Sequence, residues 1–400
     1  MKINKIKKSY NDKEVVRVSY EILNAYGVEE IWGEMPISYD PYIVTEIIDP
    51  FCLIFCNYAM ENGENIESEL PITRECFNNL CTYIKVMSDT SDYFQYITIN
   101  APIIEEKPFE TLGRRGTGCS GGVDSLYTIL NVLYGRKEEL DTLVLMNCGN
   151  YGGDRSERNL KHFQDGIDWM KSIGNELDIN TLWIDSNIHE IYEREGFSGN
   201  HSVYMRLMGC IALLGKYFGT YYIAADYTVS FTKFGSVDGG ERTLIFDSQM
   251  ASDKKLKYVG SGYDVNRVQK TQFLIQYSEI VKKYLAVCLY GEKPNCSRCP
   301  KCERAMLALY LLGGEGILEE AFDMHVFNKN RKKIFSKMLS QKKMKNALYN
   351  EIYDYCRINK VKIPIASYVM LVYYWPRYHF NKIQWMRKIY LKYIKTDRKG

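Results

Sequence analysis

The 400-residue sequence contains no apolar run of the roughly 20 residues that a membrane-spanning helix needs, so no membrane association is expected. Its first five residues, Met-Lys-Ile-Asn-Lys, contain no apolar signal segment. The 12 cysteines are therefore expected to be reduced thiols in a cytoplasmic protein rather than a disulfide framework. The tripeptides Gly-Lys-Ser and Gly-Lys-Thr are also absent, which excludes the phosphate-binding loop that depends on that lysine.

Charge is unevenly distributed along the chain. The net charge is only +3, but residues 326–400 contain 19 Lys and Arg against 3 Asp and Glu, whereas residues 1–325 contain 33 against 46. A basic segment of this kind can bind nucleic acid or another polyanion. It can equally dock on the acidic part of the same chain or of a second copy, so a nucleic-acid partner and a homodimer both stay open.

Predicted strands and helices alternate after about residue 110. Apolar strands are predicted at 142–147, 181–185 and 221–225, and helices at 126–134, 156–173 and 202–218. This alternation predicts an α/β fold with a doubly wound, mostly parallel sheet. Ligands of such sheets bind at the carboxyl ends of the strands. One cleft is therefore expected to be formed by the loops that follow Gly118, Asn147, Asp185 and Ala225.

The rest of the chain divides into three further regions around this domain at 111–287. Residues 1–110 are predicted to be an α+β region, with strands at 14–20, 51–56 and 96–100 and a helix at 71–84. Residues 288–325 contain a cysteine cluster and a helix. Residues 326–400 form a basic and mostly helical C-terminal region, interrupted by Pro364 and Pro376.

Residues 119–125, Cys-Ser-Gly-Gly-Val-Asp-Ser, are the most informative segment. They follow Arg-Arg-Gly-Thr-Gly and precede an apolar run, a context typical of a turn that opens a helix. Two adjacent glycines let the backbone approach a ligand, and the first turn of a helix has unpaired N–H groups and a positive dipole end. The two serine hydroxyls add donors, so the segment predicts a cradle for phosphate.

A second motif is a cluster of cysteines spaced Cys-x7-Cys-x2-Cys-x2-Cys, formed by Cys288, Cys296, Cys299 and Cys302. Four thiolates at this spacing can close a tetrahedral zinc site. Arg298, Lys301 and Arg304 would offset its negative charge. An iron–sulfur cluster uses similar ligands and is the alternative.

The run Ser120-Gly121-Gly122-Val123-Asp124-Ser125 resembles the PP-loop of the N-type ATP pyrophosphatases. Together with the cysteine cluster, it resembles the 7-cyano-7-deazaguanine synthase (QueC-like) branch over about residues 111–312. The resemblance implies an adenine nucleotide alpha hydrolase-like (HUP) fold and cleavage of ATP to AMP and pyrophosphate while a substrate oxygen is adenylated. That branch has a Tyr-Pro-Asp-Cys-Arg segment where this chain reads Asp-Tyr-Thr-Val-Ser-Phe from residue 226. An altered substrate, a small molecule, peptide or protein, is therefore expected.

The resemblance also implies site residues. Ser120, Ser125 and the backbone N–H groups of Gly121, Gly122 and Val123 are expected to hold the phosphates of ATP. Asp124 is expected to bind Mg²⁺ and to be catalytic together with the two serines. Adenine is expected near Met146, Asn147 and Cys148. Further candidates for substrate contacts, each of which also fits an ordinary structural role, are His201, Arg206, Asp226, Lys233 and Lys270.

Three functions are compatible with these motifs. The favoured one is an ATP-dependent ligase or synthase that adenylates a carboxylate or amide and then lets a nitrogen nucleophile displace AMP, forming a carbon–nitrogen bond. A tRNA-thiolating PP-loop enzyme, with the basic region as an RNA arm, is the second. The third is a non-catalytic ATP-binding subunit of a defence or assembly complex.

Overall fold

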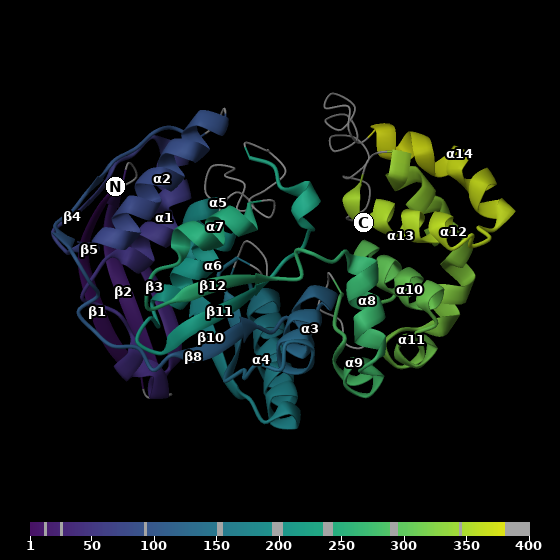
Figure 1. Cartoon of the computed structure of the whole chain (residues 1–400), viewed down its shortest axis with the longest axis horizontal. Coiled ribbons are helices and arrows are strands. Elements are labelled where there is room, and N and C mark those ends of the chain that lie inside the picture. Colours follow the sequence, from purple (N-terminus) through teal and green to yellow (C-terminus); the bar gives the residue numbers. More distant parts are fainter. Residues whose placement is uncertain are drawn as a thin grey trace. The chain divides into compact units, whose positions relative to one another are not determined.

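The computed structural model describes residues 1–380 except 12–13, 25–26, 92–93, 150–154, 194–202, 235–242, 289–294 and 344–345. The chain forms two compact units, unit 1 (Met1–Asp264) and unit 2 (Val265–Gly400) (Figure 1). This division differs from boundaries near residues 110, 287 and 325. Near residue 110 the difference arises because strands from both sides of this residue join in one sheet.

Parallel strands form the centre of unit 1, as the alternating sequence pattern predicts. The sheet order β12-β11-β8-β9-β10 is parallel throughout and confirms a doubly wound α/β fold. The strands are β8 (Arg114–Gly118), β9 (Thr142–Asn147), β10 (Asn180–Ser186), β11 (Phe218–Ala224) and β12 (Lys257–Ser261).

The order of these strands identifies where a ligand would bind. The chain passes from β8 to β9 and β10 in one direction, then crosses to β11 and β12 on the other side of β8. The topological switch point therefore lies between β8 and β11. Doubly wound sheets bind ligands at this point, beyond the carboxyl ends of the strands.

Helices cover both faces of the parallel strands. The connections between β8, β9 and β10 contain α3 (Val123–Leu130) and α4 (Glu157–Leu177), and those leading to β11 and β12 contain α6 (Val203–Ala212) and α7 (Leu244–Ala251). Right-handed crossovers place the two pairs on opposite faces (Figure 1). All six residues of β9 are consequently buried, which accounts for its uninterrupted apolar sequence.

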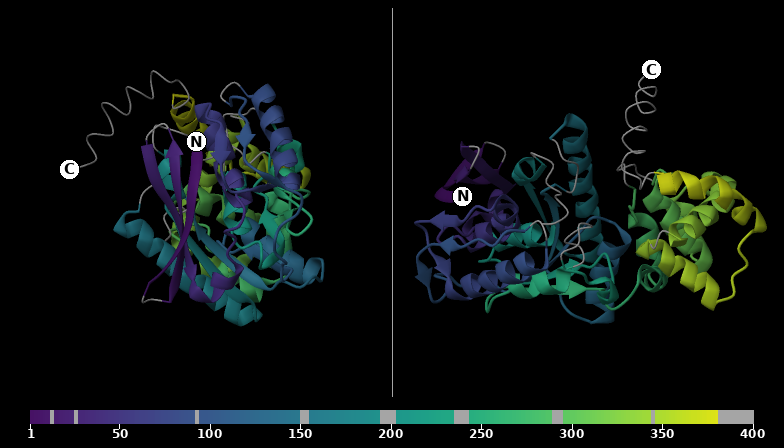
Figure 2. Two further views of the ribbon diagram at one scale, coloured as in Figure 1. Left: turned by 90° about the vertical axis from the view of Figure 1, so that its left-hand side faces the viewer. Right: turned by 90° about the horizontal axis from the view of Figure 1, so that it is seen from above.

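The N-terminal region extends the same sheet. Strands β1 (Lys2–Asn11), β2 (Val15–Asn24) and β3 (Gly27–Pro36) form an antiparallel meander, shown in purple in Figure 2. β3 pairs antiparallel with β10, joining Glu34 to Asp185 and Gly33 to Ser186. Two short strands, β4 (Ile66–Ser68) and β6 (Ile99–Asn100), follow beyond β1, so the sheet has ten strands in the described part of the chain. Separately, β5 (Ile72–Thr73) pairs with β7 (Ile103–Ile104).

Individual elements predicted from the sequence agree with the structure to different degrees. The strand predicted at 51–56 is wrong, because these residues lie in α1 (Asp49–Asn62). Every residue of α1 from Asp49 to Met60 is buried, so the helix has no polar face that would reveal its 3.6-residue period. The helix predicted at 71–84 is confirmed as α2 (Arg74–Thr90), which Thr73 caps by accepting from the N–H of Cys76. Of residues 96–100, only the last two form a strand. The helix predicted at 202–218 is shorter, since α6 ends at Ala212 and β11 begins at Phe218.

Unit 2 is helical in its described part, as the sequence predicts. A buried ion pair, with Lys337 Nζ 2.6 Å from Glu303 Oε1, joins α12 (Met324–Lys343) to α10 (Pro300–Leu312). No helix in the described ranges is long and apolar enough to cross a membrane. The helices are α8 (Arg267–Ile275), α9 (Ser278–Tyr284), α10 (Pro300–Leu312), α11 (Glu315–Ala321), α12 (Met324–Lys343), α13 (Ala347–Ile358) and α14 (Ile365–Phe380).

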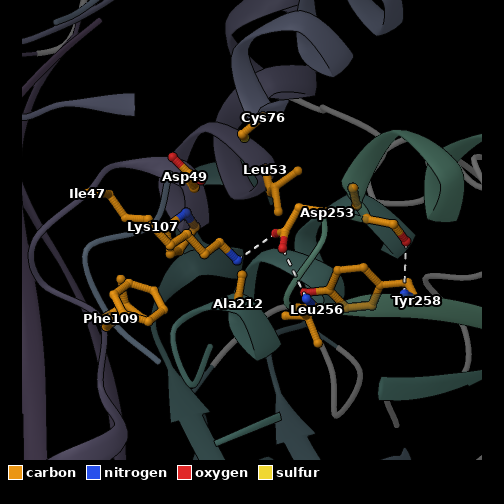
Figure 3. A pocket seen from close by; sticks show the side chains of 14 residues that line it. Ile47, Asp49, Leu53, Cys76, Lys107, Phe109, Ala212, Asp253, Leu256 and Tyr258 are labelled. Carbon is orange, nitrogen blue, oxygen red and sulfur yellow. Dashed lines mark hydrogen bonds and ion pairs between the residues drawn. The ribbon is translucent and has the colours of Figure 1, made fainter. Parts of the chain in front are cut away.

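A small cavity lies in unit 1 between the N-terminal helices and the turn from α7 to β12 (Figure 3). Its volume of about 10 Å³ is enough for about one water molecule. Lys107 Nζ lies 2.5 Å from Asp253 Oδ2 across it, with side-chain exposures of 8% and 13%. Asp253 also accepts from the backbone N–H groups of Lys255 and Leu256. The ion pair thus joins the segment before β8 to the turn before β12.

We expect Lys107→Met to lower the free energy of unfolding by about 3 kcal/mol, because it leaves the buried Asp253 carboxylate without its cation. Urea denaturation of the full chain measures the loss. Lys85→Met is the matched control, since its partner Asp89 is 55% exposed and the pair contributes less than about 0.5 kcal/mol. Equal effects of the two substitutions would contradict a structural role for the Lys107–Asp253 pair.

Candidate functional site

The predicted phosphate loop connects β8 to α3 at the switch point of the sheet. Gly121 has φ +77°, and a Cβ there would lie 2.2 Å from Cη2 of Trp169 on α4, so only glycine fits. Gly122 is the N-cap of α3, and glycine has no side chain with which to cap the helix by a hydrogen bond. The N-cap residue therefore occupies none of the first N–H groups of α3, and a helix end of this kind suits an anionic ligand.

The two serines of the loop have different roles. Ser125 Oγ donates to the carbonyl oxygen of Gly118 at 2.8 Å and accepts from the N–H of Ser120 at 3.1 Å. Ser125 is buried and braces the loop against the end of β8, so its hydroxyl is already engaged. Ser120 is exposed and Asp124 is half-buried. The structure therefore leaves Ser120 better placed than Ser125 for direct contact with a ligand.

The ends of β9 and β10 carry a polar network beside the loop. Asn147 Nδ2 donates to Asp185 Oδ1 at 2.8 Å, and the two terminal nitrogens of Arg155 bind the two Asp185 oxygens, each at 2.7 Å. This bidentate pair raises the pKa of the Arg155 guanidinium. The network holds the amide of Asn147, one of the residues expected near adenine, in a fixed orientation.

Trp32 on β3 supports this network from the N-terminal region. The guanidinium carbon of Arg155 lies 4.7 Å from the centre of its ring, and that of Arg17 lies 4.3 Å from it. Ser186 Oγ donates to the carbonyl oxygen of Trp32 at 2.6 Å. Arg155 and Trp32 belong to no motif in the sequence. Only the pairing of β3 with β10 would have indicated that the two residues lie together.

Two buried cysteines lie at the end of β9. The Sγ atoms of Cys148 and Cys210, a residue of α6, are 3.3 Å apart. This hydrogen bond and burial raise the pKa of the Cys148 thiol well above its usual value, so the thiol is protonated and neutral. The next residue, Gly149, has φ +103°, and a Cβ there would lie 3.2 Å from Nη2 of Arg206.

The remaining predicted residues fall in several places. Arg206 is buried on α6 beside Cys148 and Gly149. Asp226 follows β11, and its Oδ2 accepts from the hydroxyl of Tyr204 on α6 at 3.4 Å. Lys233 is exposed after the short turn Val229–Phe231. Lys270 is buried on α8 of unit 2, and His201 lies outside the described residues. The structure thus brings Met146, Asn147, Cys148, Arg206 and Asp226 to the same edge of the unit 1 sheet as the loop.

The four cysteines of unit 2 converge. The sulfur atoms of Cys288, Cys296, Cys299 and Cys302 all lie within 4.8 Å of one another. Cys299 caps α10 and accepts from the N–H of Cys302. Asn295 fixes the approach to the cluster, because its Oδ1 accepts from the N–H of Cys288 at 3.0 Å and its Nδ2 donates to the carbonyl oxygen of Ala321 at 3.0 Å. The chain thus brings together a set of ligands suited to one metal ion.

Comparisons with known proteins add little to this geometry. No family model and no curated protein sequence matches the chain. One similar solved structure is the U34-tRNA thiolase NcsA from Methanococcus maripaludis with its [4Fe-4S] cluster, at 13% identity and a TM-score of 0.31, over 72% of this chain and 82% of that chain. A likeness at this level defines neither fold nor function. Both are argued from the sheet order, the loop and the cysteines.

The contact between Gly121 and Trp169 generates a direct test of the loop. We expect Gly121→Ala to lower stability by about 2 kcal/mol or more, because it adds a clash to an unfavourable φ. Gly122→Ala is the matched control, since φ is −69° there and the nearest atom to a new Cβ is Ser120 Oγ at 3.7 Å. Thermal unfolding measures both. A Gly121→Ala protein as stable as Gly122→Ala would show that the loop adopts another conformation.

Proposed function

We propose that this protein is a PP-loop ATP pyrophosphatase that adenylates an acceptor substrate. The observation that carries the proposal is the loop at the switch point, where Gly121 at φ +77° leads into a helix whose N-cap is a second glycine, Gly122. Such an arrangement presents several N–H groups and a positive dipole end to a phosphate chain. The Ser-Gly-Gly-Val-Asp-Ser sequence supports ATP as the source of that phosphate.

In the proposed reaction, the backbone N–H groups of Gly121, Gly122 and Val123 and the hydroxyl of Ser120 hold the pyrophosphate end of ATP. Ser125 keeps the loop in place through its bonds to Gly118 and Ser120. Asp124 would hold Mg²⁺, which offsets the charge of the leaving pyrophosphate. The loop therefore contributes by positioning and by stabilising negative charge.

The rest of the edge would hold adenine and the acceptor. Adenine lies beside Met146, Asn147 and Cys148, with Asn147 held by Asp185. An oxygen of the acceptor, from a carboxylate or an amide, attacks the α-phosphorus and displaces pyrophosphate. A nitrogen nucleophile then displaces AMP and forms a carbon–nitrogen bond. The neutral, buried Cys148 thiol gives no support to a sulfur-transferring role for that cysteine.

A tRNA-modifying enzyme is the second candidate, and α12 is the observation that favours it. This helix carries a run of basic residues, and Lys329 and Lys332 on it are exposed. Lys337 is engaged with Glu303 and is not part of that exposed charge. Exposed lysines of this kind suit contacts with a phosphate backbone.

The rate of pyrophosphate release from ATP is measured in the presence of a cell-extract fraction that supplies the acceptor. We expect Asp124→Ala to lower this rate by at least about 100-fold and Ser120→Ala by at least about 10-fold. Asp168→Ala, an exposed position on α4, is the control and should keep the wild-type rate. Mass spectrometry of products formed with labelled ammonium, or with added tRNA, separates the two candidate functions. Full pyrophosphate release by Asp124→Ala would refute the assignment of the loop.

For the cysteine cluster of unit 2 we propose a structural zinc ion. Zinc–sulfur bonds of about 2.3 Å in a tetrahedron place the sulfurs about 3.8 Å apart. The Sγ of Cys302 lies 3.8 Å from that of Cys296 and 3.4 Å from that of Cys299, which supports a single ion. In a four-iron cluster each thiolate binds a different iron, so the sulfurs would lie farther apart.

Purified protein is therefore expected to contain about one zinc per chain by plasma mass spectrometry. Cys299→Ser and Cys302→Ser should lose that zinc and most of the stability of unit 2, because metal binding contributes directly to folding. Cys81→Ser, at an exposed cysteine of unit 1, should keep both. Stoichiometric iron with absorbance in the visible range would point to the iron–sulfur alternative.

A further inference from the structure

Arg206 on α6 carries a buried positive charge at the functional edge of unit 1. The residue is only 3% exposed. Its Nη2 lies 3.2 Å, and its Cζ 3.5 Å, from the position that a Cβ on Gly149 would take. The glycine therefore allows the guanidinium to approach the backbone just beyond the end of β9. This end of β9 lies beside β8, whose own end begins the phosphate loop.

The described part of the chain provides no counter-ion for Arg206. The side chain makes no ion pair there, and its Nε has no hydrogen-bond partner. Its guanidinium makes a cation–π contact with Tyr192, whose ring centre lies 5.0 Å from Cζ. An aromatic face offsets part of a cation's charge, but it accepts none of the hydrogen bonds that a guanidinium donates.

Two groups at this edge, the Asp185 carboxylate and the Cys148 thiol, do not neutralise Arg206. The carboxylate of Asp185 is engaged by both terminal nitrogens of Arg155 and by the amide of Asn147. The Cys148 thiol stays protonated because its hydrogen bond with Cys210 and its burial raise its pKa. A buried charge without a partner is costly to the fold. Such a group is typical of a site whose anion arrives with the ligand.

We propose that Arg206 receives a carboxylate of the acceptor substrate and orients it beside the loop. This proposal rests on the function proposed above. The loop backbone at the end of β8 already provides donors for the triphosphate, whereas Arg206 lies at the end of the neighbouring strand. A guanidinium has the planar, two-pronged geometry that binds a carboxylate through two parallel hydrogen bonds. The acceptor class is therefore an anionic small molecule or peptide that carries a carboxylate.

The experiment compares thermal unfolding of the wild-type chain with Arg206→Met, Arg206→Lys and Arg158→Met, an exposed position on α4 that serves as control. The probes are sodium succinate and sodium chloride at equal ionic strength, and Mg-ATP alone. We expect succinate to raise the wild-type melting temperature by about 2 °C or more over chloride, as a ligand of the folded state does. Arg206→Met should lose this rise and keep the shift with Mg-ATP. Without ligand, it should be at least as stable as the wild type. Arg206→Lys should keep a weaker rise, and Arg158→Met the full one.

Three results would overturn the proposal. The first is equal melting temperatures of the wild type in succinate and chloride. The second is a large loss of stability in Arg206→Met without ligand, which would mean that the fold itself pairs the charge. The third is loss of the Mg-ATP shift in Arg206→Met, which would assign the arginine to the triphosphate. An absent Mg-ATP shift in the wild type, with the succinate effect intact, would instead count against the proposed ATP chemistry alone.

Discussion

The contact between Gly121 and the ring of Trp169 is the constraint on which the candidate site depends. The ring fills the space that a side chain on Gly121 would need, so the loop can turn only with a bare backbone at this position. Trp169 belongs to α4, which leads from β9 to β10, and the loop is therefore fitted to the helix of the neighbouring strand–helix unit. Ser125 completes the arrangement by tying the loop to the end of β8. The conformation of the loop thus depends on how α4 packs on the sheet as well as on the loop sequence.

Two arginines at this edge of the sheet differ in whether an acidic side chain pairs with them. Arg155 is fully paired with Asp185 and lies against Trp32, so its charge is used to hold neighbouring groups in place. Arg206 has an aromatic neighbour in Tyr192 and no acidic partner in the described residues. A paired guanidinium has few donors left for a ligand, so Arg155 acts as a support, whereas the proposal above assigns ligand binding to Arg206. This edge of the sheet therefore combines the hydrogen-bonded group of Asn147, Asp185 and Arg155 with the positive charge of Arg206, which has no acidic partner in the described residues.

The sequence predicted those features that depend on residues close together in the chain. The Ser-Gly-Gly-Val-Asp-Ser loop, the strands at 142–147 and 181–185 and the four cysteines are all local patterns. The structure places the loop and the strands as expected for the doubly wound sheet, and it brings the four sulfur atoms of unit 2 together. The helix α1 was mistaken for a strand because its uniformly apolar sequence carries no period. Trp32 and Arg155 meet through the pairing of β3 with β10, a contact between segments more than 100 residues apart that no single window of sequence reveals. The burial of Arg206 is likewise a property of packing, because an arginine on an exposed helix face could have the same local sequence around it.

The pairing of β3 with β10 also bears on how this architecture can vary in evolution. Without β3, the outer side of β10 would be an open edge, and open edges of parallel sheets invite pairing with other chains. Here the meander covers that edge, and the backbone of Trp32 is hydrogen-bonded to the side chains of Ser186, the last residue of β10, and Asn187, the residue after it. Residues 1–110 and the parallel strands consequently share one sheet and depend on each other structurally. A relative that lost the meander would need another way to protect β10, and it would also lose the aromatic support beneath Arg155.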